Sequence, residues 1–300
     1  MLLVDLIYSR LGPFIGVLLV KTLSRESAYR VSDWIVQSLV KRRNSDLYRS
    51  VRANQAVIRD WPYEDERLHL IVQEVLSNAA YGLVDWFRTI AFASELTELP
   101  CTIDEDLLED VYRSLAEDRG IVVVGAHLSS FNLFFMMIGQ RNWPVQILSH
   151  HVEQGSYQTD NILRKKFGLN VTPISAGSLR KAYQRLESGG CVLTGVDRPD
   201  TGGEPLTFFG RTATLPIGHA RLAIQTGARV KVLAVQKVKP GKYHVIGSRL
   251  IEPEQSGDSQ RDARKLAQQV IHQLEEYIRE RPSEWMMFIP VWPEMLPKWS

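Results

Sequence analysis

Hydrophobic residues recur at helical spacing through the first 118 residues of the chain. The clearest example lies between Asp65 and Phe87, where the apolar positions are Leu68, Ile71, Val72, Val75, Leu76, Ala79, Leu83, Val84 and Trp86. A period between three and four residues is typical of an amphipathic helix with one buried face. We therefore expect this part of the chain to be helical.

The pattern changes at Gly120. Ile121–Val124 is a short run of β-branched residues, which is typical of a strand buried in a parallel sheet. Further strands are expected at Val145–Leu148, Val171–Pro173, Cys191–Val196, Val230–Val235 and Tyr243–Gly247. Helices are expected between most of them, at Gln154–Phe167, Leu179–Glu187, Gly218–Thr226 and Arg261–Arg279. This alternation predicts an α/β fold with a mostly parallel central sheet flanked by helices.

No internal repeat, low-complexity tract or Gly/Ser/Pro-rich linker divides the chain. We expect residues 1–118 to form a helical segment packed on an α/β core of residues 119–300, the two making one continuous globular unit. The chain has 300 residues, of which 44% are hydrophobic, so disordered and fibrous classes are excluded. Its two cysteines, Cys101 and Cys191, are too few for a disulfide scaffold or a Cys-rich metal site.

Charge is unevenly distributed along the chain. The net charge of +2 gives no argument for a nucleic-acid partner. Residues 1–59 nevertheless carry a balance of +6, and residues 60–119 a balance of −11. A basic surface of this kind is attracted to anionic lipid, although solvated helix faces account for the same pattern.

The first 20 residues are apolar, but Asp5 and Arg10 interrupt them and the longest charge-free run, Leu11–Val20, has only ten residues. A spanning helix needs about 20 apolar residues, and the features of a signal peptide are missing. We expect an amphipathic helix that packs on the domain or lies in a membrane interface. The basic residues after it favour peripheral or monotopic attachment to the cytoplasmic face of the inner (plasma) membrane.

Ligands of parallel sheets bind at the carboxyl ends of the strands, which points to the loops after Val124 and Val196. No serine-hydrolase elbow, nucleotide-binding loop, metalloprotease helix or C-x-x-C pair occurs in the sequence. Of the seven histidines, His127 directly follows a buried strand, where a catalytic and a structural role are both consistent with its position. His219, at a predicted helix start, is expected to be structural.

The loop after Val196 carries four charged side chains, Asp197, Arg198, Asp200 and Glu204. A solvated turn explains them, but a carboxylate here could also lie across the end of the sheet from His127.

Several segments occur in an order that resembles a known family. They are Gly125–Asn132, Arg164–Gly168, Phe208–Gly218, Leu222–Ala228 and the ending Pro282–Met287. Together they resemble the bacterial lysophospholipid acyltransferase superfamily, specifically its lipid A biosynthesis acyltransferase branch, which includes lauroyl and myristoyl transferases and phosphatidylinositol mannoside acyltransferases. The resemblance covers about residues 50–293.

The resemblance implies a membrane-associated enzyme that moves a fatty acyl chain from an acyl thioester to a hydroxyl or amine of a lipid or glycolipid. The donor would be acyl-CoA or acyl carrier protein, acting as a substrate, and neither a cofactor nor a metal is implied. Acceptor identity and chain length depend on pocket shape, which the sequence does not display. A hydrolase that delivers the acyl group to water remains an alternative.

The family signature is a His followed five positions later by an acid. His127 matches the His, but Asn132 stands at the acidic position. An Asn amide can orient an imidazole ring, yet it cannot supply the stronger charge-assisted hydrogen bond. Another carboxylate then pairs with His127, or Asn132 suffices for a slower enzyme, or the protein has lost catalysis and kept lipid binding. Glu204 is the favoured partner, because mannoside acyltransferases of the branch carry an acid just before Phe-Phe-Gly, and Asp197 is the second.

With His127 as general base, the reaction also needs donors for the oxyanion. We expect them to be the backbone N–H groups of Ser129 and Ser130, which we also expect to cap the following helix. Arg164 or Arg198 could add a charged donor, and Arg164 could instead bind coenzyme A phosphates or face solvent.

The acyl chain requires an apolar channel. Phe208 and Phe209 are the expected lining residues, because they close the acidic loop and match the family. Phe131 directly follows the histidine loop and is a further candidate, although core packing is the better explanation for most of the apolar run that it begins.

Overall fold

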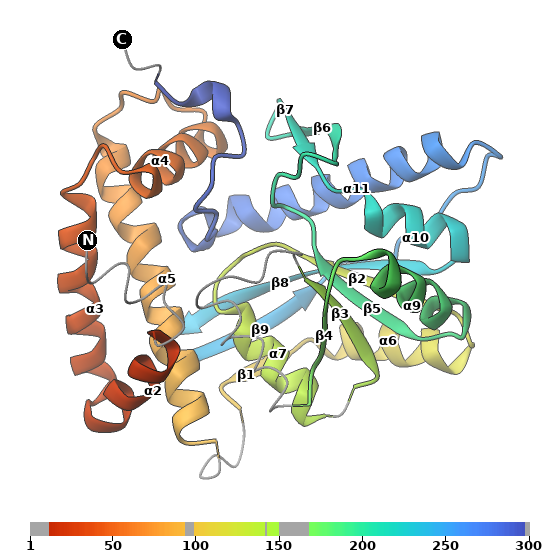
Figure 1. The fold of residues 1–300 in the computed structure, drawn as a ribbon, viewed down its shortest axis with the longest axis horizontal. Helices are drawn as coiled ribbons and strands as arrows, with labels where there is room; N and C mark the ends of the chain where they lie inside the picture. Colours follow the sequence, from red (N-terminus) through yellow and green to blue (C-terminus); the bar gives the residue numbers. More distant parts are fainter. Residues whose placement is uncertain (1–11, 94–98, 142, 150–167, 298–300) are drawn as a thin grey trace.

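A sheet of seven strands forms the centre of the computed structural model, which describes residues 12–93, 99–141, 143–149 and 168–297 (Figure 1). Its strands in chain order are β1 (Cys101–Ile103), β2 (Ile121–Gly125), β3 (Val145–Ser149), β4 (Asn170–Pro173), β5 (Cys191–Gly195), β8 (Arg229–Lys239) and β9 (Lys242–Gly247). They lie side by side in the order β1-β9-β8-β2-β5-β3-β4. All neighbours pair in parallel except β8 and β9, so the predicted α/β fold with a mostly parallel sheet is confirmed.

Helices precede the sheet in the chain and cover both of its faces. The helices in chain order are α2 (Gly12–Thr22), α3 (Arg25–Val40), α4 (Asp46–Arg59), α5 (Arg67–Ala91), α6 (Glu105–Ala116), α7 (Phe131–Gln140), α9 (Ala176–Glu187), α10 (Gly218–Thr226) and α11 (Ser259–Glu280). Two short 3₁₀ turns follow, η1 (Pro282–Glu284) and η2 (Pro293–Met295). The helix expected at Gln154–Phe167 lies outside the described residues.

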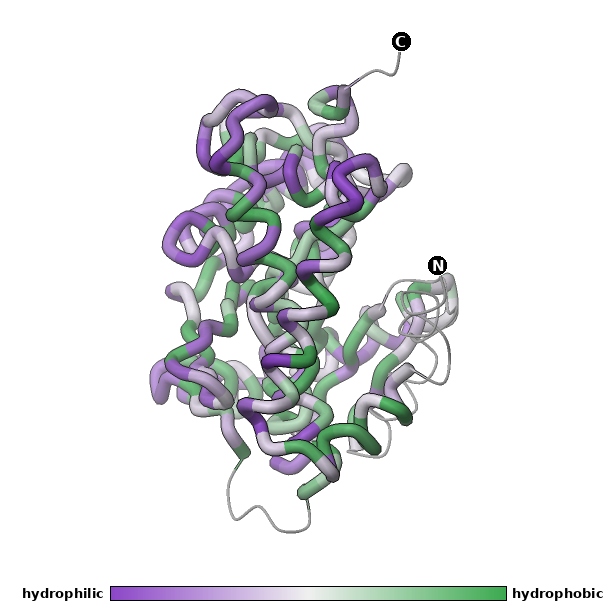
Figure 2. The backbone as a smooth tube through the Cα atoms, turned by 90° about the vertical axis from the view of Figure 1, so that its left-hand side faces the viewer, coloured by the Kyte–Doolittle hydropathy of each residue, from purple (hydrophilic) through white to green (hydrophobic). Residues whose placement is uncertain are grey.

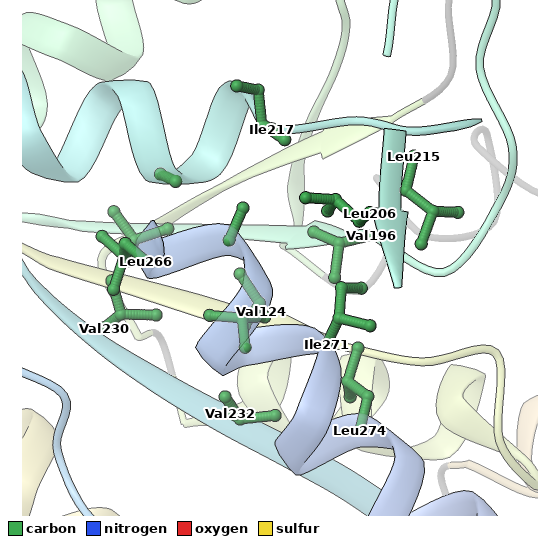
Figure 3. Packing of buried hydrophobic residues seen from close by; sticks show 14 of the residues in the cluster. Val124, Val196, Leu206, Leu215, Ile217, Val230, Val232, Leu266, Ile271 and Leu274 are labelled. Carbon is green, nitrogen blue, oxygen red and sulfur yellow. The ribbon is translucent and has the colours of Figure 1, made fainter. Parts of the chain in front are cut away.

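Strand β2 shows why a continuous apolar run marks the middle of this sheet. Successive side chains on a strand point to opposite faces. Val122 and Val124 therefore join the core beneath α9, α10 and α11, while Ile121 and Val123 join the core beneath α6 and α7. Figure 3 shows Val124 in the first core, packed with residues of β8 and α11. Because both faces of β2 are buried, its sequence does not alternate between apolar and polar residues.

Two elements differ from the expectation. Strand β1 lies within the part expected to be helical, and its three residues are too few to show a period of their own. A two-stranded hairpin, β6 (Glu204–Phe208) and β7 (Arg211–Leu215), was also not predicted. Its turn, Phe209-Gly210, has positive φ at both positions, the geometry of a tight hairpin turn. Phenylalanine is unusual there, which is why the turn is hard to recognise in the sequence.

A buried carboxylate joins the N-terminal helices to the sheet. Asp85 of α5 is 1% exposed and accepts hydrogen bonds from the Tyr29 and Tyr243 hydroxyls, the Gly241 N–H and the Arg25 guanidinium. Burial, followed by the hydrogen bond to the Asp85 carboxylate and its charge, raises the pKa of Tyr29. The bonds from Gly241 and Tyr243 to Asp85 cross the predicted boundary at residue 118. The division of the chain into a helical segment and an α/β core itself stays a prediction.

Helix α4 fixes the segment after α11. Asn54, 1% exposed, donates to the carbonyls of Met287 and Ile289 and accepts from the Val291 N–H. Gln55 donates to the Pro282 carbonyl. Backbone groups of Pro282, Met287, Ile289 and Val291 are thus paired by side chains more than 200 positions earlier in the chain.

Replacing Asp85 with Ala should lower the free energy of unfolding by about 2 kcal/mol or more, because several buried donors lose their acceptor together. Denaturant unfolding measures the difference. Glu26→Ala is the control, since the Glu26 carboxylate forms an exposed pair with Arg30 among the described residues; this substitution should change stability by less than about 1 kcal/mol. Equal effects of the two substitutions would contradict a central role for Asp85.

Candidate active site

The register of two neighbouring strands brings the histidine and a carboxylate together. Strands β2 and β5 are parallel, and Gly125 lies directly opposite Gly195. His127 and Asp197 are each the second residue after these glycines. The Val196 N–H donates to the Gly125 carbonyl at 3.3 Å, which extends the pairing beyond the strands. The two side chains therefore leave the sheet side by side at its carboxyl edge.

Asp197 holds the histidine by both its ring and its backbone. The Nδ1 atom of His127 lies 2.7 Å from Oδ1 of Asp197, and the His127 N–H donates to Oδ2 at 2.8 Å. The indole N–H of Trp285 donates to the same Oδ2 at 2.8 Å. Asp197 is 0% exposed, so these donors take the place of water around its carboxylate.

The balance of interactions keeps Asp197 ionised. Burial by itself raises the pKa of this carboxyl group, but the charge and hydrogen bonds of His127 and the Trp285 indole outweigh it and hold the pKa below its usual value. An ionised carboxylate can only accept hydrogen bonds, so Nδ1 of His127 carries the proton that faces it. In the neutral form of the ring, Nε2 then has the lone pair and is the basic nitrogen.

The loop that carries His127 is fastened to the segment after α11. The Met286 N–H donates to the His127 carbonyl at 2.8 Å, and the Ser129 N–H donates to the Glu284 carbonyl at 2.9 Å. Ser129 has a φ of +52°, a left-handed conformation that costs a non-glycine residue free energy. The two backbone bonds around it hold this conformation in place.

A cavity of about 330 Å³ opens beside the histidine, across the carboxyl ends of β2, β3 and β5. His127 lines it with a side chain that is 33% exposed, and the Phe131 ring meets the imidazole edge-on at 5.4 Å between ring centres. The apolar lining includes Phe131, Phe134, Phe135, Ile147, Leu193 and Leu233, and the polar lining includes Ser149, Arg198, Asp200, His219 and Arg221. The imidazole of His127 and a set of apolar side chains thus line the same cavity.

A larger and more open hollow, about 670 Å³, lies at the opposite ends of these strands, beside Lys181 and Arg185. It touches neither His127 nor Asp197, so the smaller cavity is the candidate active site. Among the described residues no group of three or more His, Cys, Asp or Glu side chains could hold a metal ion.

Glu204, the favoured partner of the histidine, lies elsewhere. It stands in β6, where it accepts from Arg221 at 2.8 Å and from Arg264 at 2.9 Å. The hydrogen bond from Arg264 is the largest influence that lowers the pKa of Glu204. The acid opposite His127 is Asp197, the second choice. Asn132, at the family's acidic position, is the second residue of α7. The group bonded to Nδ1 of His127 is the carboxylate of Asp197.

The Ser129 N–H and the Ser130 hydroxyl do not have the expected roles, and the oxyanion role expected of the Ser130 N–H stays a prediction. The Ser129 N–H is already bonded to Glu284, so it is not available to an oxyanion in this conformation. The Ser130 hydroxyl donates to the Gly82 carbonyl at 3.1 Å and makes no cap bond to α7. The serine loop is therefore packed into the scaffold, against α5 and the segment after α11.

The remaining predicted residues divide between the cavity and the core. Phe131 and the exposed Arg198 line the cavity, and Arg164 lies outside the described residues. Phe208 is fully buried against Trp285 and Trp292, and Phe209 packs beside it under Arg279. Neither phenylalanine is among the residues that line the cavity. Both pack instead against Trp285, whose indole N–H donates to Asp197.

Sequence reasoning missed two features of this site. Residues 121–127 read IVVVGAH and residues 191–197 read CVLTGVD, so each predicted strand ends in Gly, one spacer and a titratable residue. This shared ending is a signal for the pair, once the strands are known to be neighbours. The role of Trp285 as a donor to Asp197 has no comparable signal, because it depends on a contact between segments 88 positions apart.

Comparison with known proteins gives a match over most of the chain. The family model described as bacterial lipid A biosynthesis acyltransferase matches residues 9–294. Phosphatidylinositol mannoside acyltransferases from two strains of Mycobacterium tuberculosis are each 28% identical to the chain over 127 residues. That similarity spans 40% of this chain and 40% of the length of each relative.

Replacing Trp285 with Phe should keep most of the packing and remove one donor to a charged acceptor, at a cost of about 1.5–3 kcal/mol of stability near neutral pH. Because the pKa of Asp197 is lowered in the fold, the stability that its carboxylate contributes is complete above the unfolded-state pKa, about 4. It is lost as the pH falls through the lower, folded value. The difference between variant and wild type should therefore be constant from about pH 5 to 8 and shrink in acid. Unfolding curves across pH test this, and a difference independent of pH would contradict it.

Proposed function

The chain belongs to the bacterial lipid A biosynthesis acyltransferase family, and from this membership we propose that it transfers a fatty acyl chain from an acyl thioester to a hydroxyl of a lipid or glycolipid. The observation that carries the proposal is the bond between Nδ1 of His127 and the buried carboxylate of Asp197, beside an apolar cavity. The similarity to mannoside acyltransferases supports a glycolipid acceptor. Acyl-CoA and acyl carrier protein are the two candidate donors.

The proposed chemistry begins at Nε2 of His127. This nitrogen removes the proton of the acceptor hydroxyl while the oxygen attacks the thioester carbonyl carbon. The carbonyl π electrons move to oxygen and give a tetrahedral intermediate. When the carbon–oxygen double bond re-forms, the carbon–sulfur bond breaks and the leaving thiolate takes the proton back from the imidazolium. The products are an acylated lipid and a free thiol, and no acyl-enzyme is formed.

Asp197 supplies what Asn132 cannot. As His127 gains a proton, its positive charge lies beside an ionised carboxylate, and a charge-assisted hydrogen bond is about twice as strong as a neutral one. Of the three explanations for Asn132, this geometry favours the one in which another carboxylate is the partner. The family's acid is then replaced by one from the end of β5, beside the histidine rather than on the helix after it.

The acyl chain is proposed to occupy the apolar part of the cavity. Phe131, Phe134 and Phe135 of α7 line one side, and Leu193 and Leu233 of the sheet line its floor. A thioester whose chain lies against these residues presents its carbonyl to the polar side, where His127 stands.

We further propose peripheral or monotopic attachment to the cytoplasmic face of the membrane. No helix among the described residues is long and apolar enough to cross a bilayer. Helix α2, however, leaves Phe14, Leu18 and Leu19 exposed at 52%, 65% and 48%. Most residues of this helix are hydrophobic, as the hydropathy colours of Figure 2 show. Trp34 on α3 is exposed at 65%. Apolar side chains beside basic residues are typical of an interfacial helix.

Thioester turnover with glycolipid and lysolipid acceptors, read by mass spectrometry, tests the reaction. His127→Ala should lower kcat by about 10²–10⁴-fold, because general-base assistance is lost. Asp197→Asn should also lower kcat strongly, since the ring loses its charged partner. Glu204→Gln is the matched control: it removes a carboxylate that contacts two arginines, and it should retain activity. Free fatty acid in excess of acylated lipid would establish a hydrolase instead, and lipid binding without turnover would establish a catalytically inactive homologue.

Co-sedimentation with vesicles containing anionic lipid tests the surface. Leu18→Glu should reduce the bound fraction, because a charge in the interface opposes insertion of α2. Leu70→Glu is the matched control, since Leu70 is 68% exposed but lies near the opposite end of α5 from the part that packs on α2. Equal loss with both variants would show that α2 is not the contact.

A further inference from the structure

One glycine of the candidate active site is not required by its backbone conformation. Gly195 ends β5, and its φ is not positive, so any residue could adopt its conformation. A glycine weakens a strand and often marks a place where a ligand or another backbone approaches closely. The other residues of β5 are buried, whereas Gly195 is exposed and lines the cavity beside His127. Its bare Cα is therefore part of the cavity surface.

Gly125, which lies opposite Gly195 on β2, is explained by packing. A Cβ atom built on Gly125 would lie 3.1 Å from a side-chain carbon of Leu233, so the Leu233 side chain already fills that space. A Cβ atom built on Gly195 would instead lie 3.3 Å from Cε1 of His127. Cε1 is bonded to Nε2, the basic nitrogen. The space over Gly195 therefore borders the place where the base acts.

Gly195 also connects the two parts of the cavity. Successive side chains on a strand point to opposite faces, so Gly195 lies on the same face as Leu193, two residues earlier. Leu193 belongs to the apolar floor on which the acyl chain is proposed to lie. An acyl chain that lies on Leu193 and brings its carbonyl carbon to His127 passes over the backbone at Gly195. The carbonyl carbon and the adjacent chain carbon, C2, then occupy the room that a side chain would fill.

We propose that Gly195 is a specificity-determining residue, whose bare backbone receives the carbonyl end of the acyl thioester and leaves room for a small branch at C2. This inference rests on the proposed acyl transfer and states which acyl groups the same site accepts. Straight acyl chains and chains with a methyl branch at C2 both fit over Gly195. A methyl group added to the protein at this position and a methyl group on C2 of the substrate compete for one space.

Two thioesters and two proteins test this competition. Release of free coenzyme A is followed with dodecanoyl-CoA and with 2-methyldodecanoyl-CoA, whose enantiomers are measured separately in the presence of a glycolipid acceptor. Gly195→Ala should lower kcat/KM for the better branched enantiomer by about 10–200-fold more than for the straight thioester, the usual effect of one extra carbon in a filled pocket. The lower intrinsic reactivity of the branched thioester cancels in this comparison, because it is the same for both proteins.

The same experiment separates substrate contact from a displaced histidine. If the new methyl group only moves the imidazole away from Asp197, kcat/KM falls equally for both thioesters, and the inference is overturned. The variant should remain folded, since the built Cβ atom meets no backbone atom closer than 3.8 Å. Gly177→Ala is the matched control, because Gly177 on α9 does not line the cavity and its Cβ atom would make only an ordinary contact, at 3.9 Å. This control should change neither kcat/KM.

A binding measurement keeps the inference separate from the proposed function. Ketone analogues of the two thioesters, in which CH₂ replaces the sulfur, cannot be cleaved. In calorimetry, Gly195→Ala should lose about 10–200-fold more affinity for the branched ketone than for the straight one. If wild type does not turn over but this difference remains, the acyl transfer fails and the role of Gly195 stands. If wild type turns over and the variant loses affinity for both ketones equally, or for neither, the role of Gly195 fails and the acyl transfer stands.

Discussion

The burial of one negative charge organises this molecule. The carboxylate of Asp197 has no contact with water and needs donors on all sides to remain ionised. The donors come from two parts of the chain, the loop after β2 and the segment after α11, and the acid itself stands on the loop after β5. Each must be correctly placed, because an uncompensated buried charge costs several kcal/mol. The geometry of His127 is thus coupled to the stability of the whole fold.

The helices of the N-terminal part take part in this arrangement from a distance. Asn54 and Gln55 on α4 pair the backbone of residues 282–291, and Asn78 on α5 donates to the Ser283 carbonyl. That segment in turn bonds the loop of His127 and donates the Trp285 indole to Asp197. The helical part for which we propose membrane attachment therefore also positions the loop of His127. The proposed membrane contact and these bonds use different side chains, since the bonded side chains are buried and Leu18 and Trp34 are exposed.

The sequence predicts the sheet and most of its helices because their apolar periods are long and regular. It misses β1, which has three residues, and the β6–β7 hairpin, whose turn holds a phenylalanine with positive φ. In the site, position at a strand end is enough to select His127. The choice between Glu204 and Asp197 depends on which strands are neighbours, and family analogy favoured the wrong acid. Arg221 and Arg264, which hold Glu204, come from helices that a linear reading does not bring together.

The place of Trp285 in the chain has a consequence for biosynthesis. The ribosome makes the histidine loop and the Asp197 loop well before residues 282–291, and at about 5–20 residues per second the interval between positions 127 and 285 is roughly 8–30 s. From residue 197 onward the nascent polypeptide has both members of the pair, but it lacks the indole and the backbone groups that hold them until residues 282–291 are made. The site can assume its final geometry only after the segment that follows α11 has emerged and docked on α4. Translation order thus delays completion of the candidate site until after every strand of the described sheet has been synthesised.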